Sequence, residues 1–540
     1  MTVSSRGSTP TMPSGDAGGI APAADDTRII TAVDDTRYLG AVDDTSYLGT
    51  MVADTADEPG RRRIARHRRM PAPPPPPAVR VLPLPAGWPL VALLLLFPLW
   101  WALGLGVLIF PILAVPMAAE LMRRRPIKSP PGFILWGLFL VVVVISFIAL
   151  GINPPGTVHS TFANRLPGAM LRLVEYLSVT IIMLYAGNLT EKELPQRRLI
   201  RLLAWCFVFT VAGGLIGTFI PHLEFTSPVE YLLPSHIRSN SFVQSLVHPS
   251  ASQEMHVLGY DTPRAAAPWG YTNVWGNCYF ILVLWFVVAG WTHATRRWHR
   301  VVTVVVLAIS AVPMIYSLNR GLWLALGLAA VYIAVRLAMR GRWMSIVAIG
   351  VAGVIGLGVL AYTPVGDMVT SRVQHGASND VRVYTTQKAL ENIPDSPIIG
   401  FGSTRNTAGS DQSIAVGSTD TCQNCGEHTL GSNGQVWLEL YAHGILGALL
   451  FFGMGLVGIW HYRRDRSAVG IVTSCVLLLN LFASGYYNTL IGPLVFTYLS
   501  YALVWRRHMI IDENRRAAAN AVGPQIGPVR RRRSAALAGG

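Results

Sequence analysis

The sequence carries little charge for its length. Only 14% of its 540 residues are charged and 51% are hydrophobic, whereas an ordinary soluble domain has about 25% charged residues. Apolar stretches of about 18 residues or more recur along most of the chain, and each is typical of a membrane-spanning helix. This composition excludes a soluble enzyme, a secreted disulfide scaffold and a nucleic-acid-binding domain.

Several catalytic signatures are also missing. The chain has no Walker A sequence, no HExxH, no GxSxG and no EF-hand loop, which argues against nucleotide hydrolysis, a zinc protease and a hydrolase with a nucleophile elbow. No cleavable signal peptide is visible, because the first apolar run begins near residue 88. Of the five cysteines, Cys206, Cys278 and Cys475 lie in apolar runs and are expected to act as small core hydrophobes.

The net charge of +15 reflects membrane orientation. Most arginines lie in short loops beside apolar runs, and such loops are typically cytoplasmic. The apolar run from Trp88 to Met122 is too long for one span, so we expect a hairpin turning near Gly104–Gly106. We therefore predict an all-α polytopic membrane protein of about twelve spans with both termini in the cytoplasm. The spans lie near 88–103, 105–122, 132–151, 168–188, 199–220, 271–291, 301–316, 322–339, 344–362, 434–460, 467–484 and 489–505.

The two ends of the chain are expected to be cytoplasmic tails, 1–87 and 506–540, around a membrane domain at 88–505. Residues 1–87 hold few large apolar residues and a polyproline run, which is typical of disorder. A nine-residue repeat there places a threonine after two aspartates at Thr27, Thr36 and Thr45. The repeat is either a solvated low-complexity tail or a set of phosphorylation sites for a phosphothreonine-binding protein.

Two long loops, about 221–270 and 363–433, are predicted on the outer face, and loops of this length usually carry function. Short helices are expected in the second loop, for example around Asp380–Glu391. Arg320, at an outer helical turn, is either a snorkelling arginine or a clamp for a phosphate. Arg382 and Arg405 are assigned to the same face. Together the three arginines suit a pyrophosphate, although each alone is also compatible with a solvated position.

Cys422 and Cys425 form a C-x-x-C pair in the second loop. An external compartment favours a disulfide, while free thiols and a zinc site with His428 stay open as alternatives. Glu427 and His428 are each also a candidate general base. Near the start of another span, Asn273 and Trp275 belong either to an interfacial aromatic belt or to a sugar-binding surface.

Three stretches give the chain a family resemblance: SLNRGLWLALGLAAVY (317–332), NDVRVYTTQKALENIPDSPIIGFGSTR (379–405) and SNGQVWLELYAHGILGALLFFG (432–453). In sequence and in order they resemble the O-antigen ligase and polymerase family of membrane glycosyltransferases, actinobacterial members in particular. FPLWWALGLGVLIFPILAVP (97–116) and PWGYTNVWGN (268–277) are similar as well.

The resemblance implies a fold related to the GT-C glycosyltransferases and no metal or nucleotide cofactor. It implies that Arg320 and Arg382, with Arg405 as a weaker match, hold the pyrophosphate of a polyprenyl-linked donor. The family often has a histidine about eleven residues before a helix glycine. Counting back from Gly444 reaches Asn433, so His428 is the candidate substitute. Asn433 and Gln435 are expected to bind substrate.

The predicted function is transfer of a glycan from a polyprenyl-pyrophosphate donor to a sugar hydroxyl of a glycan or glycolipid acceptor. It would take place at the outer face of a bacterial inner membrane, with membrane lipids around the protein and no nucleic acid partner. Two alternatives stay open. A flippase or other transporter of polyprenyl-linked glycans would use the same arginines without forming a bond. A non-catalytic scaffold would recruit partners through a phosphorylated tail. The sequence does not separate a ligase from a polymerase.

Overall fold

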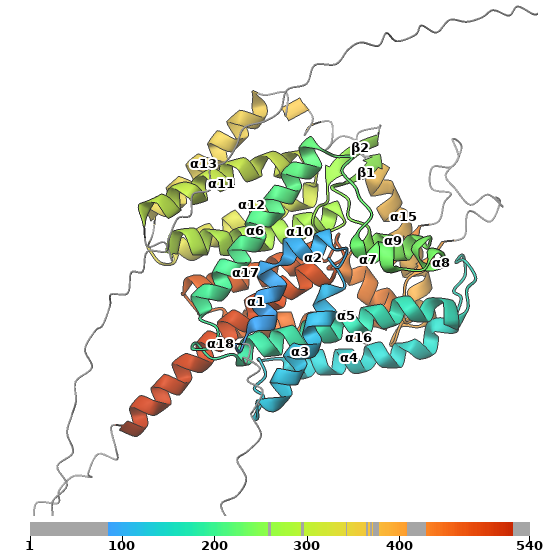
Figure 1. Cartoon of the computed structure of the whole chain (residues 1–540), viewed down its shortest axis with the longest axis horizontal. Coiled ribbons are helices and arrows are strands. Elements are labelled where there is room, and N and C mark those ends of the chain that lie inside the picture. Colours follow the sequence, from blue (N-terminus) through green and yellow to red (C-terminus); the bar gives the residue numbers. More distant parts are fainter. Residues whose placement is uncertain are drawn as a thin grey trace, which may run out of the picture. The chain divides into compact units, whose positions relative to one another are not determined.

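The computed structural model describes residues 85–256, 261–292, 296–341, 343–362, 366–367, 370, 377–407 and 428–521. This part of the chain is mostly helical (Figure 1). The helices up to the first strand are α1 (Trp88–Leu95), α2 (Phe97–Ala102), α3 (Ile109–Arg123), α4 (Phe133–Ser146), η1 (Phe147–Gly151), α5 (Phe162–Asn188), α6 (Gln196–Phe219), α7 (Pro228–Leu232), α8 (Ser235–Arg238) and α9 (Ser241–Val247).

The later helices follow two short strands. They are α10 (Thr272–Val287), η2 (Val288–Thr292), α11 (Arg297–Tyr316), α12 (Arg320–Ala338), α13 (Trp343–Ala361), α15 (Ala377–Asn392), η3 (Ile393–Asp395), α16 (Gln435–Tyr462), α17 (Ala468–Ala483) and α18 (Ile491–Ala521). Strand β1 (Ser252–His256) pairs antiparallel with β2 (Asp261–Ala265), and β3 (Arg405–Asn406) pairs antiparallel with β4 (Thr429–Leu430).

Seven helical segments in the described part are long and apolar enough to cross a membrane. They comprise α4 with η1, α5, α6, α10 with η2, α11, α12 and α16. This finding supports the predicted polytopic helical membrane protein, while the number twelve stays a prediction. The first predicted span, 88–103, is wrong as a single helix, because the chain breaks at Leu96 into α1 and α2. Pro98, in the first turn of α2, has no amide hydrogen to continue the hydrogen bonds of α1.

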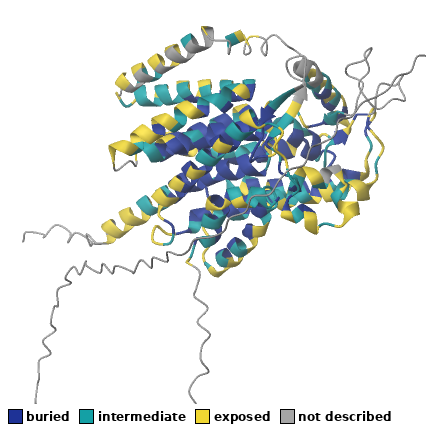
Figure 2. Ribbon diagram, turned by 45° about the horizontal axis from the view of Figure 1, so that its top comes forward, coloured by how far each residue is buried: buried dark blue, intermediate teal, exposed yellow. Residues whose placement is uncertain are grey.

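Helix α10 lies at the centre of the helical packing. It packs against α6 on one side and α18 on another, while α16 packs against α4 and α5 packs against α3 and α18. Trp136, Trp275 and Trp285 are fully buried between these helices, and Figure 2 shows the buried residues concentrated there. Because α10 has neighbours on several sides, apolar residues cover nearly all of its circumference.

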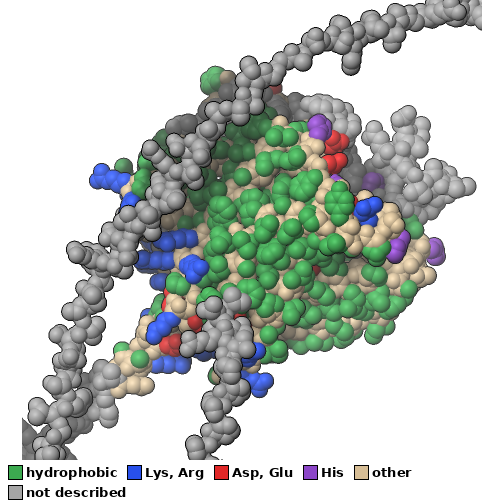
Figure 3. All heavy atoms as spheres, viewed as in Figure 1, with side chains coloured by type: hydrophobic (Ala, Val, Ile, Leu, Met, Phe, Trp, Pro, Cys, Tyr) green, Lys and Arg blue, Asp and Glu red, His purple; other side chains and the backbone are tan. Residues whose placement is uncertain are grey.

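The surface carries a broad apolar belt. In Figure 3 hydrophobic side chains cover most of the visible face, and Lys and Arg side chains gather towards its left and lower edges. Exposed apolar side chains such as Ile134, Val141 and Ile148 belong to α4 and η1, which form one of these seven segments. A belt of this kind suits contact with lipid tails. We call the ends of the helices near Arg123, Arg197 and Arg463 the basic end, and the opposite ends the loop end.

The loop end contains more regular structure than a pair of simple loops. Helices α7, α8 and α9 and the β1–β2 hairpin fill the connection between α6 and α10. In the second connection, α15 confirms the helix expected around Asp380–Glu391. The segment after α15 docks on α16 at Gly444, which has φ of 69° and ψ of −175° inside the helix. A Cβ there would lie 2.3 Å from the carbonyl oxygen of Ile398, so this close approach requires glycine.

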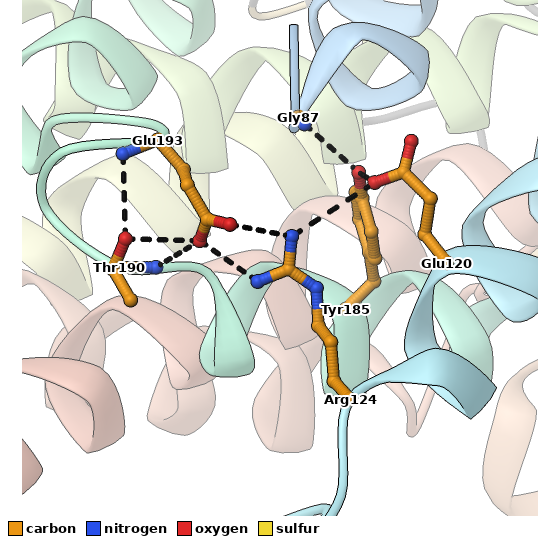
Figure 4. A network of polar contacts seen from close by, with 6 residues as sticks. All are labelled: Gly87, Glu120, Arg124, Tyr185, Thr190 and Glu193. Carbon is orange, nitrogen blue, oxygen red and sulfur yellow. Dashed lines mark hydrogen bonds and ion pairs between the residues drawn. The ribbon is translucent and has the colours of Figure 1, made fainter. Parts of the chain in front are cut away.

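At the basic end, a polar cluster joins four parts of the chain (Figure 4). Arg124, just after α3, contacts Glu193 through both of its terminal nitrogens, at 2.8 and 2.7 Å. Tyr185 of α5 donates a hydrogen bond to Glu120 of α3 and accepts one of 3.0 Å from the amide of Gly87. The cluster therefore fastens the start of α1, the end of α3 and the loop between α5 and α6.

Lowering the pH from about 6 to about 3 is expected to weaken this cluster. The hydrogen bond from Arg124 lowers the pKa of Glu193 from 4.5 to about 2. A carboxylate with a depressed pKa stabilises the fold fully above its unfolded pKa, and that contribution is lost as the pH falls from about 4.5 to about 2. The effect should stay below about 1 kcal/mol, because the pair is partly solvated. Thermal unfolding in detergent should show it, and Glu193→Gln should remove this part of the pH dependence. An unchanged pH dependence in Glu193→Gln would contradict the assignment.

Candidate functional site

The turn between α11 and α12 places Arg320 at the first residue of α12. Leu318 has φ of 49°, a left-handed conformation that is unfavourable for a residue with a Cβ, and its side chain is buried. Asn319 then caps α12, because its Oδ1 accepts a hydrogen bond of 3.0 Å from the amide of Leu322. This buried, conformationally costly turn fixes where Arg320 emerges at the loop end.

Two tyrosines between α17 and α18 pack against this turn. Tyr487 donates a hydrogen bond from its hydroxyl to Oδ1 of Asn319. Tyr486 donates one of 3.3 Å to the carbonyl oxygen of Gly321. A Cβ at Gly321 would lie 2.5 Å from the hydroxyl oxygen of Tyr487, so the residue after Arg320 must be small. No motif in the sequence points to these two tyrosines.

A further arginine reaches the same turn from the connection between α6 and α10. Arg264 of β2 is 4% exposed, and its Nε donates a hydrogen bond of 2.6 Å to the carbonyl oxygen of Ser317. Its own carbonyl oxygen lies 3.4 Å from the hydroxyl of Thr272 at the start of α10. Arg264 belongs to none of the motifs in the sequence. The only signal was an arginine on the predicted outer face, and nothing in its local sequence indicated burial.

Helix α15 brings Arg382 to this region, and Asn433 holds the helix in place. The side-chain amide of Asn433 donates to the carbonyl oxygen of Arg382 at 2.9 Å and to the hydroxyl of Thr386 at 3.0 Å. It also contacts the hydroxyl of Thr385. Asn433, predicted to bind substrate, is therefore directed towards α15 and positions Arg382.

Three arginines from three separate elements converge around Tyr487. The guanidinium carbon of Arg382 lies 5.8 Å from the centre of the Tyr487 ring. Arg264 and Arg320 also lie within electrostatic range of Tyr487, and Arg320 lies within range of Arg382. Like charges at short range repel each other, and a bound polyanion would offset that cost. Guanidinium groups match phosphate oxygens in geometry, so the cluster suits a phosphate-bearing ligand.

His428 lies beside the same helix. Its amide donates a hydrogen bond of 3.0 Å to the hydroxyl of Thr407, and its carbonyl oxygen accepts one of 2.9 Å from the Thr407 amide. Its ring centre is 6.2 Å from the ring centre of Tyr384 on α15. The Nε2 atom is buried and has no hydrogen-bond partner among the described residues. His428 therefore lies next to α15, the helix that carries Arg382.

Arg405, the third predicted arginine, lies apart from this cluster. It is 2% exposed, and it donates hydrogen bonds to the carbonyl oxygens of Ala149, Leu150, Ile152, Phe401, Ser403 and Thr404. Burial, together with repulsion from Arg165, lowers its pKa from 12.5 to about 10. It therefore stays protonated at neutral pH. These contacts indicate that Arg405 holds the segment that follows α4 against the turn that precedes β3.

Gln435 is buried and supports the segment that carries Tyr487. Its backbone amide donates to the carbonyl oxygen of Tyr487 at 2.9 Å, and its side-chain Oε1 accepts from the backbone amide of Thr489 at 2.8 Å. Its Nε2 donates to Glu439 at 2.6 Å. Gln435, predicted to bind substrate, thus has protein partners on both sides of its side-chain amide.

The predicted aromatic surface near the start of α10 divides into two parts. Trp275 is fully buried, donates a hydrogen bond of 2.9 Å to the carbonyl oxygen of Thr210 and packs against Tyr279. It therefore lies between α6 and α10, away from any sugar that docks on the surface. Asn273 is partly exposed and precedes it in the first turn of α10.

Several predicted sites lie outside the described residues. They are the phosphorylation candidates Thr27, Thr36 and Thr45 and the cysteine pair Cys422 and Cys425. Among the residues that the structure does describe, no three His, Cys, Asp or Glu side chains are grouped so that they could hold a metal ion. The alternatives for the cysteine pair therefore stay as the sequence left them.

Comparison with protein families gives one match. Residues 305–421 match the family model described as O-antigen ligase. The matched segment contains Arg320, Arg382 and Arg405 and ends before His428. It confirms the resemblance that the sequence motifs indicated. No curated protein matches the chain.

Proposed function

We propose that this chain is a membrane glycosyltransferase of the O-antigen ligase or polymerase type. It would transfer a glycan from a polyprenyl-pyrophosphate-linked donor to a hydroxyl of an acceptor sugar at the outer face of a bacterial plasma membrane. The observation that carries the proposal is the convergence of Arg264, Arg320 and Arg382 around Tyr487 at the loop end. The match of residues 305–421 to O-antigen ligases supports it.

In this proposal the arginines stabilise the leaving group. The acceptor oxygen attacks the anomeric carbon with inversion while the bond from that carbon to the pyrophosphate breaks. Negative charge then develops on the bridging oxygen, and donors fixed at that position before the reaction stabilise the transition state most. Arg320 and Arg382 supply this charge stabilisation, Arg264 assists, and the proposed mechanism uses no metal ion or nucleotide cofactor.

The attacking hydroxyl must lose a proton, and His428 is the candidate acceptor that the sequence offers. Its ring lies next to Tyr384, two residues after Arg382 on α15. A general base of this kind contributes about 10² to 10⁴ in rate. Asn273, on the partly exposed side of the first turn of α10, stays a candidate contact for a sugar.

Incubation of the purified full-length protein with a polyprenyl-pyrophosphate glycan and a panel of sugar acceptors tests the function. The expected result is an acceptor that gains the glycan together with released polyprenyl pyrophosphate, both measured by mass spectrometry. A ligase and a polymerase differ in which acceptor reacts. Movement of the intact donor across vesicle membranes without any new glycosidic bond would favour the transporter alternative. The absence of both activities would favour the scaffold with a phosphothreonine-binding partner at the N-terminal tail.

Single cysteines introduced at the exposed positions Asp395 and Arg463 should label from opposite sides of the membrane. The proposal places residues 221–270 and 363–433 outside, with both termini in the cytoplasm. Arg463 belongs to the basic end, and basic loops stay in the cytoplasm. Membrane-impermeant thiol reagents should therefore modify a cysteine at residue 395 in intact spheroplasts and one at residue 463 only after lysis. Cytoplasmic labelling at residue 395 would overturn the proposed function.

A further inference from the structure

A set of polar side chains is fully buried among the membrane helices. Glu439 is 0% exposed, His443 is 1% exposed and Tyr176 is 3% exposed. Glu439 and His443 lie one helical turn apart on α16, and Tyr176 comes from α5. Ionisable residues inside a membrane are costly, so they usually serve a function.

The two carboxylate oxygens of Glu439 have different surroundings. Oε1 accepts a hydrogen bond of 2.7 Å from the hydroxyl of Tyr176 and one of 2.6 Å from Nε2 of Gln435. Oε2 faces Nε2 of His443 at 3.8 Å. Neither of these two facing atoms has a hydrogen-bond partner among the described residues. Because Oε1 is occupied by two donors, a proton on this carboxyl group would reside on Oε2.

The tautomer of His443 follows from Ser146. The Ser146 hydroxyl has one hydrogen, which it donates to the carbonyl oxygen of Val143 at 2.7 Å. Its oxygen also lies 3.0 Å from Nδ1 of His443, so Nδ1 must be the donor in that contact. The neutral ring then has its lone pair on Nε2, the atom that faces Glu439.

One position for a proton therefore lies between Glu439 and His443. Without that proton, a lone pair and a carboxylate oxygen face each other at 3.8 Å, which is longer than a hydrogen bond. One added proton would give Oε2 of Glu439 and Nε2 of His443 a shared hydrogen bond and would draw these two atoms together. The charged and titratable groups within electrostatic range of the pair and of Tyr176 are Arg172, Glu175 and Tyr176 of α5 and Tyr498 of α18. Arg172 and Glu175 also line the cavity beside Tyr176.

The pair is connected to the arginine cluster through Gln435 and the segment that carries Tyr487. Gln435 bonds to Glu439 on one side and to the backbone of Tyr487 and Thr489 on the other. Tyr176, Gln435 and Thr489 also line a cavity of about 10 Å³, close to the volume that one water molecule needs. Residues 487–489 thus contact both the arginine cluster and the cavity beside Tyr176.

We propose that the Glu439–His443 pair, in place of His428, accepts the proton of the attacking acceptor hydroxyl. This inference rests on the proposed glycosyl transfer. The acceptor O–H bond breaks as its oxygen bonds to the anomeric carbon, and the bond to the pyrophosphate breaks with its electron pair on the leaving group. The proton reaches Tyr176 through the cavity, and the hydroxyl proton of Tyr176 moves to Oε1 of Glu439, the atom to which it is hydrogen-bonded. A half-turn of the protonated carboxyl group then brings this proton to the position that faces Nε2 of His443. Return of the proton by the same route resets the pair.

Glu439→Gln is the decisive variant, and the chain offers a matched control. Glu120 also accepts a hydrogen bond from a tyrosine of α5, Tyr185, but at the basic end. In lipid nanodiscs, Glu439→Gln should lower kcat about 10² to 10⁴-fold with little change in KM, while Glu120→Gln should keep wild-type kcat. Misfolding should not explain the loss, because the amide introduced by Glu439→Gln can accept from Tyr176 and donate to His443. Its unfolding temperature should therefore equal or exceed that of the wild type.

The pH–rate profile separates proton transfer from structural support. Wild-type kcat should fall on the acid side as the pair becomes protonated, and the residual activity of Glu439→Gln should lack this limb. Tyr176→Phe should slow transfer as well, because it interrupts the route. Wild-type kcat and an unchanged profile in Glu439→Gln, with Arg320→Ala inactive, would overturn this inference and leave the proposed function intact. A wild-type protein without any transfer would instead remove the proposed function.

Infrared difference spectroscopy tests the pair without an activity assay. Wild type minus Glu439→Gln should show one carboxyl band that converts to carboxylate as the pH rises, and His443→Gln should shift the pH of that conversion. A Glu439 that stays ionised or stays protonated across the whole working range of pH would overturn the inference.

Discussion

Arg320→Ala and Arg382→Ala are each expected to reduce glycan transfer about 10² to 10³-fold while the protein stays folded. Each change removes a guanidinium group that donates hydrogen bonds to the pyrophosphate, on which negative charge develops as it departs. Hydrogen bonds to a charged acceptor are about twice as strong as neutral ones. The loss should appear in kcat, because the charge develops mainly in the transition state. Initial rates with a polyprenyl-pyrophosphate glycan, at matched amounts of folded protein, provide the measurement.

Arg320→Lys should restore only part of the rate. An ammonium keeps the charge but cannot reproduce the planar fork that meets two phosphate oxygens. Arg463→Ala is the matched control, because Arg463 lies over Trp460 at the basic end and far along α16 from its first residue, Gln435. It should transfer glycan at the wild-type rate.

Two results would contradict the arginine clamp. Wild-type transfer by Arg320→Ala would show that this guanidinium does not stabilise the leaving group, and the transporter and scaffold alternatives would gain support. Loss of activity in His428→Ala, with active arginine variants, would show that proton transfer at His428 limits the rate. With the Glu439–His443 pair as the proton acceptor, His428→Ala should cost much less than either arginine change.

The apolar pattern of the sequence predicts the membrane helices well where each helix stands alone in one apolar run. The predicted span 301–316 corresponds to α11, Arg297–Tyr316, and 322–339 corresponds to α12, Arg320–Ala338. The predicted span 489–505 ends well before α18, which continues to Ala521. Hydropathy reports the part of a helix that meets lipid, whereas hydrogen bonding and propensity continue the helix into water.

The candidate site is harder to predict from the sequence, because it is formed by residues that lie far apart along the chain. Arg320 and Arg382 could be selected as outer arginines, but their common neighbour Tyr487 lies more than one hundred residues further along the chain. Asn433 and Gln435 were selected by their place in a motif. The structure shows that the side-chain amide of Asn433 holds α15, and that the backbone amide and side-chain oxygen of Gln435 hold the Tyr487 segment. A motif identifies residues at a site without separating those that contact ligand from those that position their neighbours.

Glu439 and His443 carried a signal that the sequence analysis did not use. A glutamate and a histidine four residues apart inside a predicted span share one helix face. Only the structure places Tyr176 and Ser146 against them, and those contacts define where the proton resides.

Arg405→Ala is expected to destabilise the fold far more than it changes the chemistry of any molecule that stays folded. The side chain is almost fully buried and supplies donors to carbonyl oxygens of η1, of the chain after it and of the turn before β3. Each buried acceptor that loses its donor costs about 1–3 kcal/mol. These costs are not additive, because the vacated space can relax or admit water, yet a loss of several kcal/mol is the expected order.

Arg405→Lys should be an intermediate case, because one ammonium can donate three hydrogen bonds and cannot span all of these carbonyl oxygens. Unfolding temperature in detergent and resistance to limited proteolysis measure the effect, with Arg320→Ala as the comparison that should unfold like the wild type. Arg405→Ala should therefore mainly lower the stability of the fold, whereas Arg320→Ala should mainly lower the rate of glycan transfer. If Arg405→Ala unfolds at the wild-type temperature but transfers no glycan, Arg405 contacts the donor, and the pyrophosphate site extends from Tyr487 to the β3–β4 hairpin.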